Sequence, residues 1–254
     1  MRQFDGTSLE LSQFDLRFEL SCEVSYWFDH VSRLAEPFAS LAPAEGVRDT
    51  RNAMAPIRVE VKAGDLIGYS SGTVPAHVWD FVLVNTAVTV RFANQQRYET
   101  AGDLRSLLHA VCPADYLAPA LRAEYVALYG SWTPGGQGTG CDTAVDLVGT
   151  IAGGWFQTPF DASNSFAGAD WGVVASIAGG GEVDVNGPGR SVRTAPSDPT
   201  FADPKLVTGE HCFQNSNQPS WAYLKVLSDS ELGAAFGDGA CPLTFPSDYR
   251  TFYR

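Results

Sequence analysis

One short motif places a serine in a setting typical of serine esterases. Gly68-Tyr-Ser70-Ser-Gly72 matches G-x-S-x-G, the turn that exposes the nucleophile of those enzymes after an apolar strand. In this hypothesis Ser70 is the nucleophile and His77 or His109 is its base. Asp80 then orients the histidine. The motif should open into a helix, yet a proline and a strand-like run follow it. An ordinary glycine- and serine-rich turn is therefore the alternative interpretation.

Two further groups of residues are typical of proteins that act on or bind sugars. Asp15, Glu19 and Glu23 fall on one side of a strand pattern, where carboxylates form acid–base pairs for glycoside cleavage. A solvated strand face produces the same pattern. Aromatic residues make up 12% of the chain, and exposed rings stack on sugars whereas buried rings fill a core. The candidates in loop-bounded stretches are Trp132, Trp155, Phe156, Trp171 and Trp221.

The N-terminal third has the period of β-strands. Apolar and polar residues alternate from Gln13 to Phe28, with Cys22 on the apolar side. At about 3.3 Å a residue this run exceeds an ordinary strand, so we predict a bend or hairpin near Ser21 to Glu23. Short strands at 57–61 and 66–69 around a turn at Lys62 to Asp65 follow, and then a mostly buried strand at 77–84.

Helical spacing appears only in the middle of the chain. One helix is predicted from Thr100 to Val111 and a second from Pro119 to Tyr129, with Leu121 and Leu128 directed inward. Beyond Trp132 short apolar runs between turn residues favour further β-structure.

Part of the chain resembles the lysostaphin-type zinc endopeptidases, which cut peptidoglycan cross-bridges on a duplicated hybrid-motif β-sandwich. The resemblance is carried by VKAGDLIGYSSGT, at Val61 to Thr73, and by HVWDF, at His77 to Phe81. Upstream, YWFDHVS at Tyr26 to Ser32 is similar to the strand whose histidine assists catalysis in that family. The similarity covers about residues 14–84.

The metal ligands of that family are mostly replaced in this sequence. No H-x-x-x-D pair precedes His30, and Trp79 or Asp80 stands in place of a ligand histidine. Zinc in a catalytic site needs three protein ligands and one open position. The resemblance implies that His30, His77 and Asp80 come from adjacent strands, where two histidines and one carboxylate are a recognised metal-binding set. The alternatives are a residual zinc site and plain structural roles without a cofactor.

These observations predict a mainly β fold. We expect a β-sandwich of hybrid-motif type in residues 1–95, a short two-helix insertion in 96–131 and a second disulfide-linked β-rich region in 132–254. The expected function is that of a non-peptidase descendant of the peptidase scaffold that binds polysaccharide, peptidoglycan or another cell-surface ligand. The alternative is a hydrolase that uses His30, His77 and Asp80, or the Ser70 nucleophile.

The cysteines and the net charge bear on compartment and partners. None of the five cysteines lies in a C-x-x-C pair, and we predict the disulfides Cys112–Cys141 and Cys212–Cys241, with Cys22 free. Five reduced cysteines are the alternative. Two disulfides indicate an extracellular or periplasmic protein. A net charge of -12 argues against nucleic acid and anionic lipid as partners, and no apolar stretch approaches the length of a membrane span.

Overall fold

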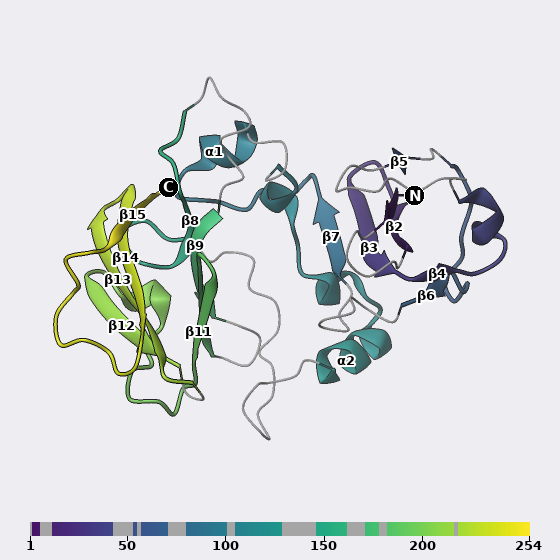
Figure 1. Cartoon of the computed structure of the whole chain (residues 1–254). Coiled ribbons are helices and arrows are strands. Elements are labelled where there is room, and N and C mark those ends of the chain that lie inside the picture. Colours follow the sequence, from purple (N-terminus) through teal and green to yellow (C-terminus); the bar gives the residue numbers. More distant parts are fainter. Residues whose placement is uncertain are drawn as a thin grey trace. The chain divides into compact units, whose positions relative to one another are not determined.

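The computed structural model describes residues 2–5, 12–42, 53–54, 57–70, 80–100, 105–128, 146–161, 171–177, 182–215 and 218–254. The fold is mainly β, as predicted (Figure 1). The chain divides into two compact units, Met1–Ala87 and Val88–Arg254. The three-part division expected from the sequence stays a prediction.

The first unit contains a five-stranded antiparallel sheet in the order β5-β1-β2-β3-β7. Its strands are β1 (Arg2–Asp5), β2 (Ser12–Glu19), β3 (Val24–Val31), β5 (Ala53–Met54) and β7 (Phe81–Asn85). A small second sheet pairs β4 (Arg33–Leu34) with β6 (Gly68–Tyr69), and a 3₁₀ turn, η1, spans Phe38–Leu41. The core of this unit is Leu16, Val31 and Leu34. Partly buried residues, most of them aromatic, pack against this core: Phe14, Phe18, Phe28, Phe38, Ala42 and Ile67.

A hairpin joins β2 to β3, which confirms the bend predicted near Ser21 to Glu23. The backbone N–H of Leu20 donates to the carbonyl of Val24 at 2.9 Å and closes the turn. Cys22 lies in this turn as an exposed free cysteine, so the prediction that it faces inward was wrong. Strand alternation stops where β2 ends, at Glu19, and no longer fixes the direction of the turn residues.

The turn at Lys62 to Asp65 is confirmed, but the strands around it are shorter than predicted. The N–H of Asp65 donates to the Lys62 carbonyl at 3.0 Å, and the Asp65 carboxylate accepts from the N–H of Lys62 at 2.8 Å. Gly64 has φ 94°, which favours glycine. Residues 57–61 form no strand, and only Gly68–Tyr69 of the predicted 66–69 strand is paired. Residues 71–79 lie outside the described residues, and β7 begins at Phe81.

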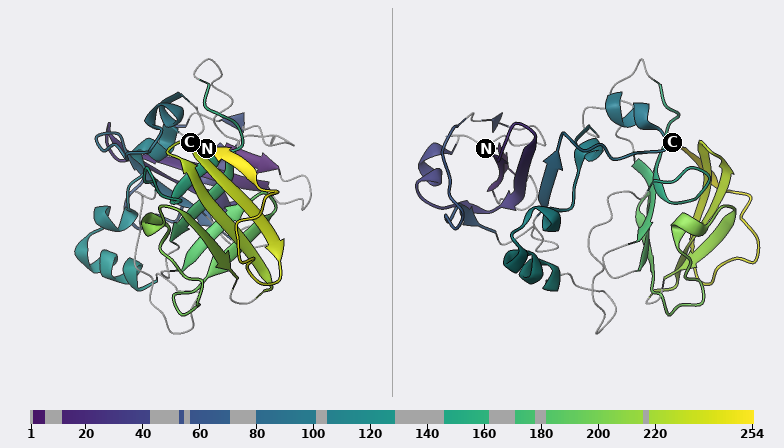
Figure 2. Two further views of the ribbon diagram at one scale, coloured as in Figure 1. Left: turned by 90° about the vertical axis from the view of Figure 1, so that its left-hand side faces the viewer. Right: turned by 180° about the vertical axis from the view of Figure 1, so that it is seen from behind.

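The second unit contains an eight-stranded antiparallel sheet that is nearly closed into a barrel. Two meanders of consecutive strands compose it, β8 to β11 and β12 to β15, and they face each other in Figures 1 and 2. The strands are β8 (Gly153–Phe156), β9 (Trp171–Ile177), β10 (Val183–Gly187), β11 (Arg190–Thr194), β12 (Glu210–Gln214), β13 (Ser220–Ser228), β14 (Glu231–Asp238) and β15 (Arg250–Tyr253).

Two seams hold these meanders together. Strands β8 and β15 meet through one residue pair, Phe156 with Tyr253. On the other side, the hydroxyl of Thr194 in β11 donates to the carbonyl of Gln214 in β12 at 3.1 Å. A 3₁₀ turn, η4 (Pro204–Leu206), lies in the connection between these two strands.

Side chains fill the interior of the barrel, as expected for eight strands. Trp155 is fully buried, and its indole N–H donates to the Ile151 carbonyl at 3.0 Å. The rest of the core is aliphatic with two phenylalanines: Ile151, Val173, Ala175, Val183, Val185, Val192, Phe213, Ala222, Leu224, Leu232, Ala234 and Phe252.

The helices differ in part from the prediction. Helix α1 (Gln95–Thr100) ends at Thr100, where a helix was expected to begin. Residues 105–109 form a 3₁₀ turn (η2, Arg105–His109), and Pro113–Tyr116 forms another (η3). Helix α2 (Pro119–Ala127) confirms the second prediction. The prediction that Leu121 and Leu128 face inward was wrong, because these side chains are 52% and 81% exposed.

The predicted disulfide Cys212–Cys241 is confirmed, with the two sulfur atoms 2.07 Å apart. Cys112 is disulfide-bonded as well. Cys141 lies outside the described residues, so its pairing with Cys112 stays a prediction. Within the described part of the chain, no helix has the length and apolarity needed to cross a membrane.

Candidate metal site at a bulge of strand β3

The candidate site lies at a β-bulge in the first unit. In the β2–β3 ladder Leu16 pairs with Phe28 and Phe14 pairs with Val31, so β3 carries one extra residue between these pairs. His30 has φ 60°, a left-handed conformation that non-glycine residues seldom adopt. Bulges of this kind redirect side chains and are common beside functional sites.

The bulge brings Asp29 and His30 together with Asp80. His30 Nε2 lies 3.4 Å from Asp80 Oδ2. One ligand atom from each of the three residues lies within 4.8 Å of the others. Neighbouring residues of a regular strand point to opposite faces, so Asp29 and His30 would diverge without the bulge.

Backbone hydrogen bonds fix the two strands that supply these residues. Phe28 pairs with Phe81 in the β3–β7 ladder, and the N–H of Asp29 donates to the Asp80 carbonyl at 2.9 Å. The Asp29 carboxylate accepts from the N–H of His30 at 2.9 Å, which holds the left-handed turn. The backbone positions of all three residues thus follow from the pairing of β3 with β7 and the segment before it.

The site is partly open to water. The side chain of His30 is 27% exposed and that of Asp80 is 60% exposed. One imidazole and two carboxylates are a ligand set that suits zinc and similar transition metals. Such a set leaves coordination positions for a solvent molecule, which is the arrangement that metal hydrolases use.

Ser70, the candidate nucleophile, lies at the edge of this site. Its hydroxyl donates to the backbone carbonyl of His30 at 2.9 Å. Next to it, the N–H of Ser32 donates to the Tyr69 carbonyl at 2.9 Å, which ties β6 to the end of β3. The residues after Ser70 in the G-x-S-x-G motif, and His77, lie outside the described residues. Both assignments stay predictions.

Other candidates from the sequence lie elsewhere. His109, the alternative base for Ser70, is half-buried, with Nδ1 2.6 Å from the Val88 carbonyl. The acidic strand face is also different from the expectation: Asp15 is 2% exposed and lies 3.3 Å from Arg17 Nε, whereas Glu19 and Glu23 are exposed. These three carboxylates therefore do not share one solvated face.

Sequence reasoning missed Asp29. The alternating pattern assigns it to the opposite side from His30, and only the bulge overrides that assignment.

Comparisons of the chain with protein-family models, curated proteins and solved structures give no match.

Proposed function

We propose that the unit Met1–Ala87 binds a divalent transition metal through Asp29, His30 and Asp80, and that the protein is a metal-dependent hydrolase. The observation that supports this proposal most is the 3.4 Å approach of His30 Nε2 to Asp80 Oδ2, with an Asp29 oxygen in the same cluster. The relationship to the zinc endopeptidases stays part of the proposal, and the altered ligand set argues against cross-bridge cleavage.

The residues of the chain have separate tasks in this proposal. A metal held by Asp29, His30 and Asp80 would supply a Lewis acid that activates water for hydrolysis. Asp29 both contributes a ligand oxygen and holds the backbone of His30. Ser70 keeps the His30 carbonyl in place through its hydroxyl, so it acts as a positioning residue. The exposed Asp80 marks the side open to substrate.

Hydrolysis of chromogenic esters and phosphodiesters by the full chain tests this proposal. We expect activity that 1,10-phenanthroline abolishes and that added zinc restores. His30→Ala should lower the activity at least about 100-fold, because loss of a group that only orients a metal ligand already costs about 10–100-fold. Asp115→Asn, which changes an exposed aspartate of the other unit, should leave the activity unchanged. Activity that survives the chelator and is lost in Ser70→Ala, with fluorophosphonate labelling of Ser70, supports the esterase alternative instead.

Glycan or cell-surface binding is a second proposed function, independent of the metal. One observation in the second unit favours it: Trp221 is only half-buried and lines a groove. The other described aromatic candidates, Trp155 and Phe156, are fully buried in the core. Trp132 and the side chain of Trp171 lie outside the described part.

We further propose that the protein is exported to an extracellular or periplasmic location. The disulfide Cys212–Cys241 supports this, because such bonds persist in oxidising compartments.

A further inference from the structure

Trp221 lies flat on the sheet in the second unit. It pairs with Gly237 across β13 and β14. A Cβ atom built on Gly237 would lie 2.4 Å from Cζ2, 2.6 Å from Cε2 and 3.0 Å from Nε1 of the Trp221 ring. Three ring atoms at similar distances show that the indole covers the glycine, and a side chain at residue 237 would displace it.

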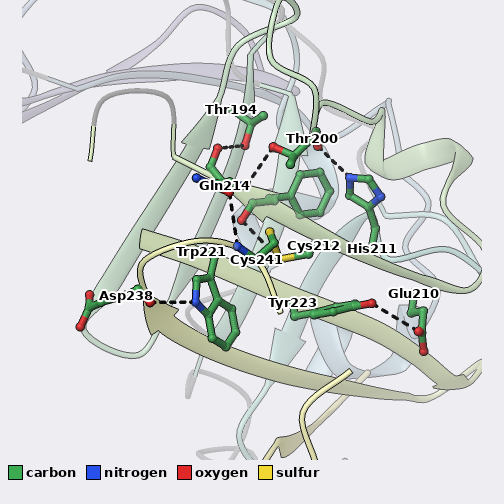
Figure 3. Close-up of a disulfide and its surroundings, with 11 residues drawn as sticks. Thr194, Thr200, Glu210, His211, Cys212, Gln214, Trp221, Tyr223, Asp238 and Cys241 are labelled. Carbon is green, nitrogen blue, oxygen red and sulfur yellow. Dashed lines mark hydrogen bonds between the residues drawn. A yellow bond between two sulfur atoms is a disulfide. The ribbon is translucent and has the colours of Figure 1, made fainter. Parts of the chain in front are cut away.

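A hydrogen bond holds the ring in this position. The indole N–H donates to the Asp238 carbonyl at 3.2 Å (Figure 3). With one face against the strand and its nitrogen bonded, the ring has little freedom left. The result is a preorganised aromatic platform.

The platform forms part of a groove of ≈ 380 Å³. This volume is in the range of about 300–1,000 Å³ that is typical of small-molecule sites. The lining includes apolar groups, among them Phe236, Pro242 and Pro246, and two charged side chains, Asp248 and Arg250.

The segment 239–249, which forms one wall, is fastened to the sheet. The disulfide Cys212–Cys241 ties its start to β12 (Figure 3). Further along, the ring of Phe245 packs edge-on against Tyr223, with centroids 5.4 Å apart, and lies 5.0 Å from the ring of Tyr249. The groove therefore needs little reorganisation to receive a ligand.

We propose that this groove binds a neutral sugar ring that stacks on Trp221. The apolar face of a pyranose matches the indole. Its hydroxyls find an acceptor in Asp248 and donors in Arg250. These two charges offset each other, and the net charge of -12 on the chain disfavours anionic polysaccharides. The inference rests on the second proposed function and does not involve the metal site.

Isothermal titration calorimetry of the full chain with chitohexaose and cellohexaose, and with an oligogalacturonate as the anionic control, tests the inference. We expect binding of at least one neutral oligomer and none of the anionic one. Trp221→Ala should weaken binding about tenfold or more, since loss of a stacking ring costs on the order of 1.4 kcal/mol. Trp221→Phe, which keeps a flat ring but loses the hydrogen bond to the Asp238 carbonyl, should bind more weakly than the wild type and more tightly than Trp221→Ala.

One control and one second groove variant separate folding from recognition. Trp27→Ala removes a half-buried tryptophan of the other unit and should leave affinity unchanged. Asp248→Ala leaves the platform intact and should weaken binding about threefold or more, as loss of a hydrogen bond to a charged group does. This arm keeps the inference testable if Trp221→Ala does not fold.

The outcomes distinguish an error in the assigned binding groove from an error in the proposed glycan binding. Binding of a neutral oligomer that neither Trp221→Ala nor Asp248→Ala alters overturns the groove and leaves the proposed glycan binding standing. Preference for the anionic oligomer overturns the assigned ligand class. Binding of none of the three overturns both proposals.

Discussion

The guanidinium carbon of Arg254 lies 3.9 Å from the centre of the Trp155 ring. Arg254 follows β15 and Trp155 belongs to β8, the two strands that meet through a single residue pair. Arg254 Nη2 donates to the carbonyls of Thr150 and Ala152, and Arg254 Nε lies 3.0 Å from Asp146 Oδ1. The buried Arg254 thus joins the contact between β8 and β15 to residues 146–152, which precede β8.

Arg254→Met should destabilise the protein by about 3–5 kcal/mol, because it leaves the buried Asp146 carboxylate without its cation. The double variant Arg254→Met/Asp146→Leu should recover at least half of that loss. Urea unfolding followed by circular dichroism measures both.

The exposed pair Arg122–Asp115 supplies the control for this ion pair. Its side chains are 56% and 60% exposed, so Arg122→Met should cost less than about 1 kcal/mol. If Arg254→Met and Arg122→Met lower the unfolding free energy equally, burial of the Arg254–Asp146 ion pair does not make it more important for stability than the exposed pair.

Stability should fall in alkaline solution because of Tyr98. This residue is 1% exposed, and burial raises the pKa of its phenol far above 10.0, with the Asp146 charge adding to the effect. The unfolded chain releases this proton near pH 10 and the folded chain does not. The contribution of Tyr98 to the unfolding free energy is therefore complete below about pH 10. It is lost as the pH rises further, by about 1.4 kcal/mol per pH unit.

Tyr98→Phe should remove this component, so its unfolding free energy should decline less steeply between about pH 10 and 11.5. Tyr69→Phe, which removes the phenol of a residue that is 44% exposed, is the matched control. Parallel curves for the wild type and Tyr98→Phe would contradict the prediction.

The disulfide Cys212–Cys241 closes a loop with a sequence separation of 29. Replacing both cysteines by alanine should lower the unfolding free energy by about 3–4 kcal/mol in the chain-entropy model. Cys22→Ser changes an exposed free thiol and should have no effect. Guanidinium unfolding of the three proteins measures the difference, and a double variant as stable as Cys22→Ser would show that the cross-link adds nothing.

Gly172 in β9 has no room for a methyl group. A Cβ there would lie 2.1 Å from Cδ1 of Phe252, a buried ring of the barrel core. Gly172→Ala should cost about 1–3 kcal/mol by overpacking. Gly209 has nothing within 4 Å of the added atom, so Gly209→Ala should change the thermal midpoint little. A midpoint for Gly172→Ala as high as that for Gly209→Ala would contradict this packing.

Local patterns in the sequence predicted the mainly β fold class, the β2–β3 hairpin, the turn at Lys62 to Asp65 and helix α2. These predictions succeeded because the periodicity of apolar residues and the residue preferences of turns act over only a few residues. The same reasoning failed where a partner distant in sequence decides. Leu121 and Leu128 satisfy a helical stripe but are exposed, since periodicity alone does not supply a surface to cover them.

The candidate site shows the same limit. His30 and Asp80 were predicted as neighbours from a family resemblance, and the structure brings their side chains together. Asp29 joins them through a bulge defined by pairing with β2, which no local pattern encodes. The barrel seam was equally hidden, since Arg254 and Asp146 are far apart in sequence.

Metal content tests the central claim most directly. The full chain, stripped with chelator, dialysed against zinc and desalted, should retain about one equivalent by inductively coupled plasma mass spectrometry. His30→Ala and Asp80→Asn should retain less than about a tenth of an equivalent, because even loss of a group that only orients a ligand weakens metal binding about 10–100-fold. A folded wild-type protein with no zinc, or variants that bind as much zinc as the wild type, would contradict the account.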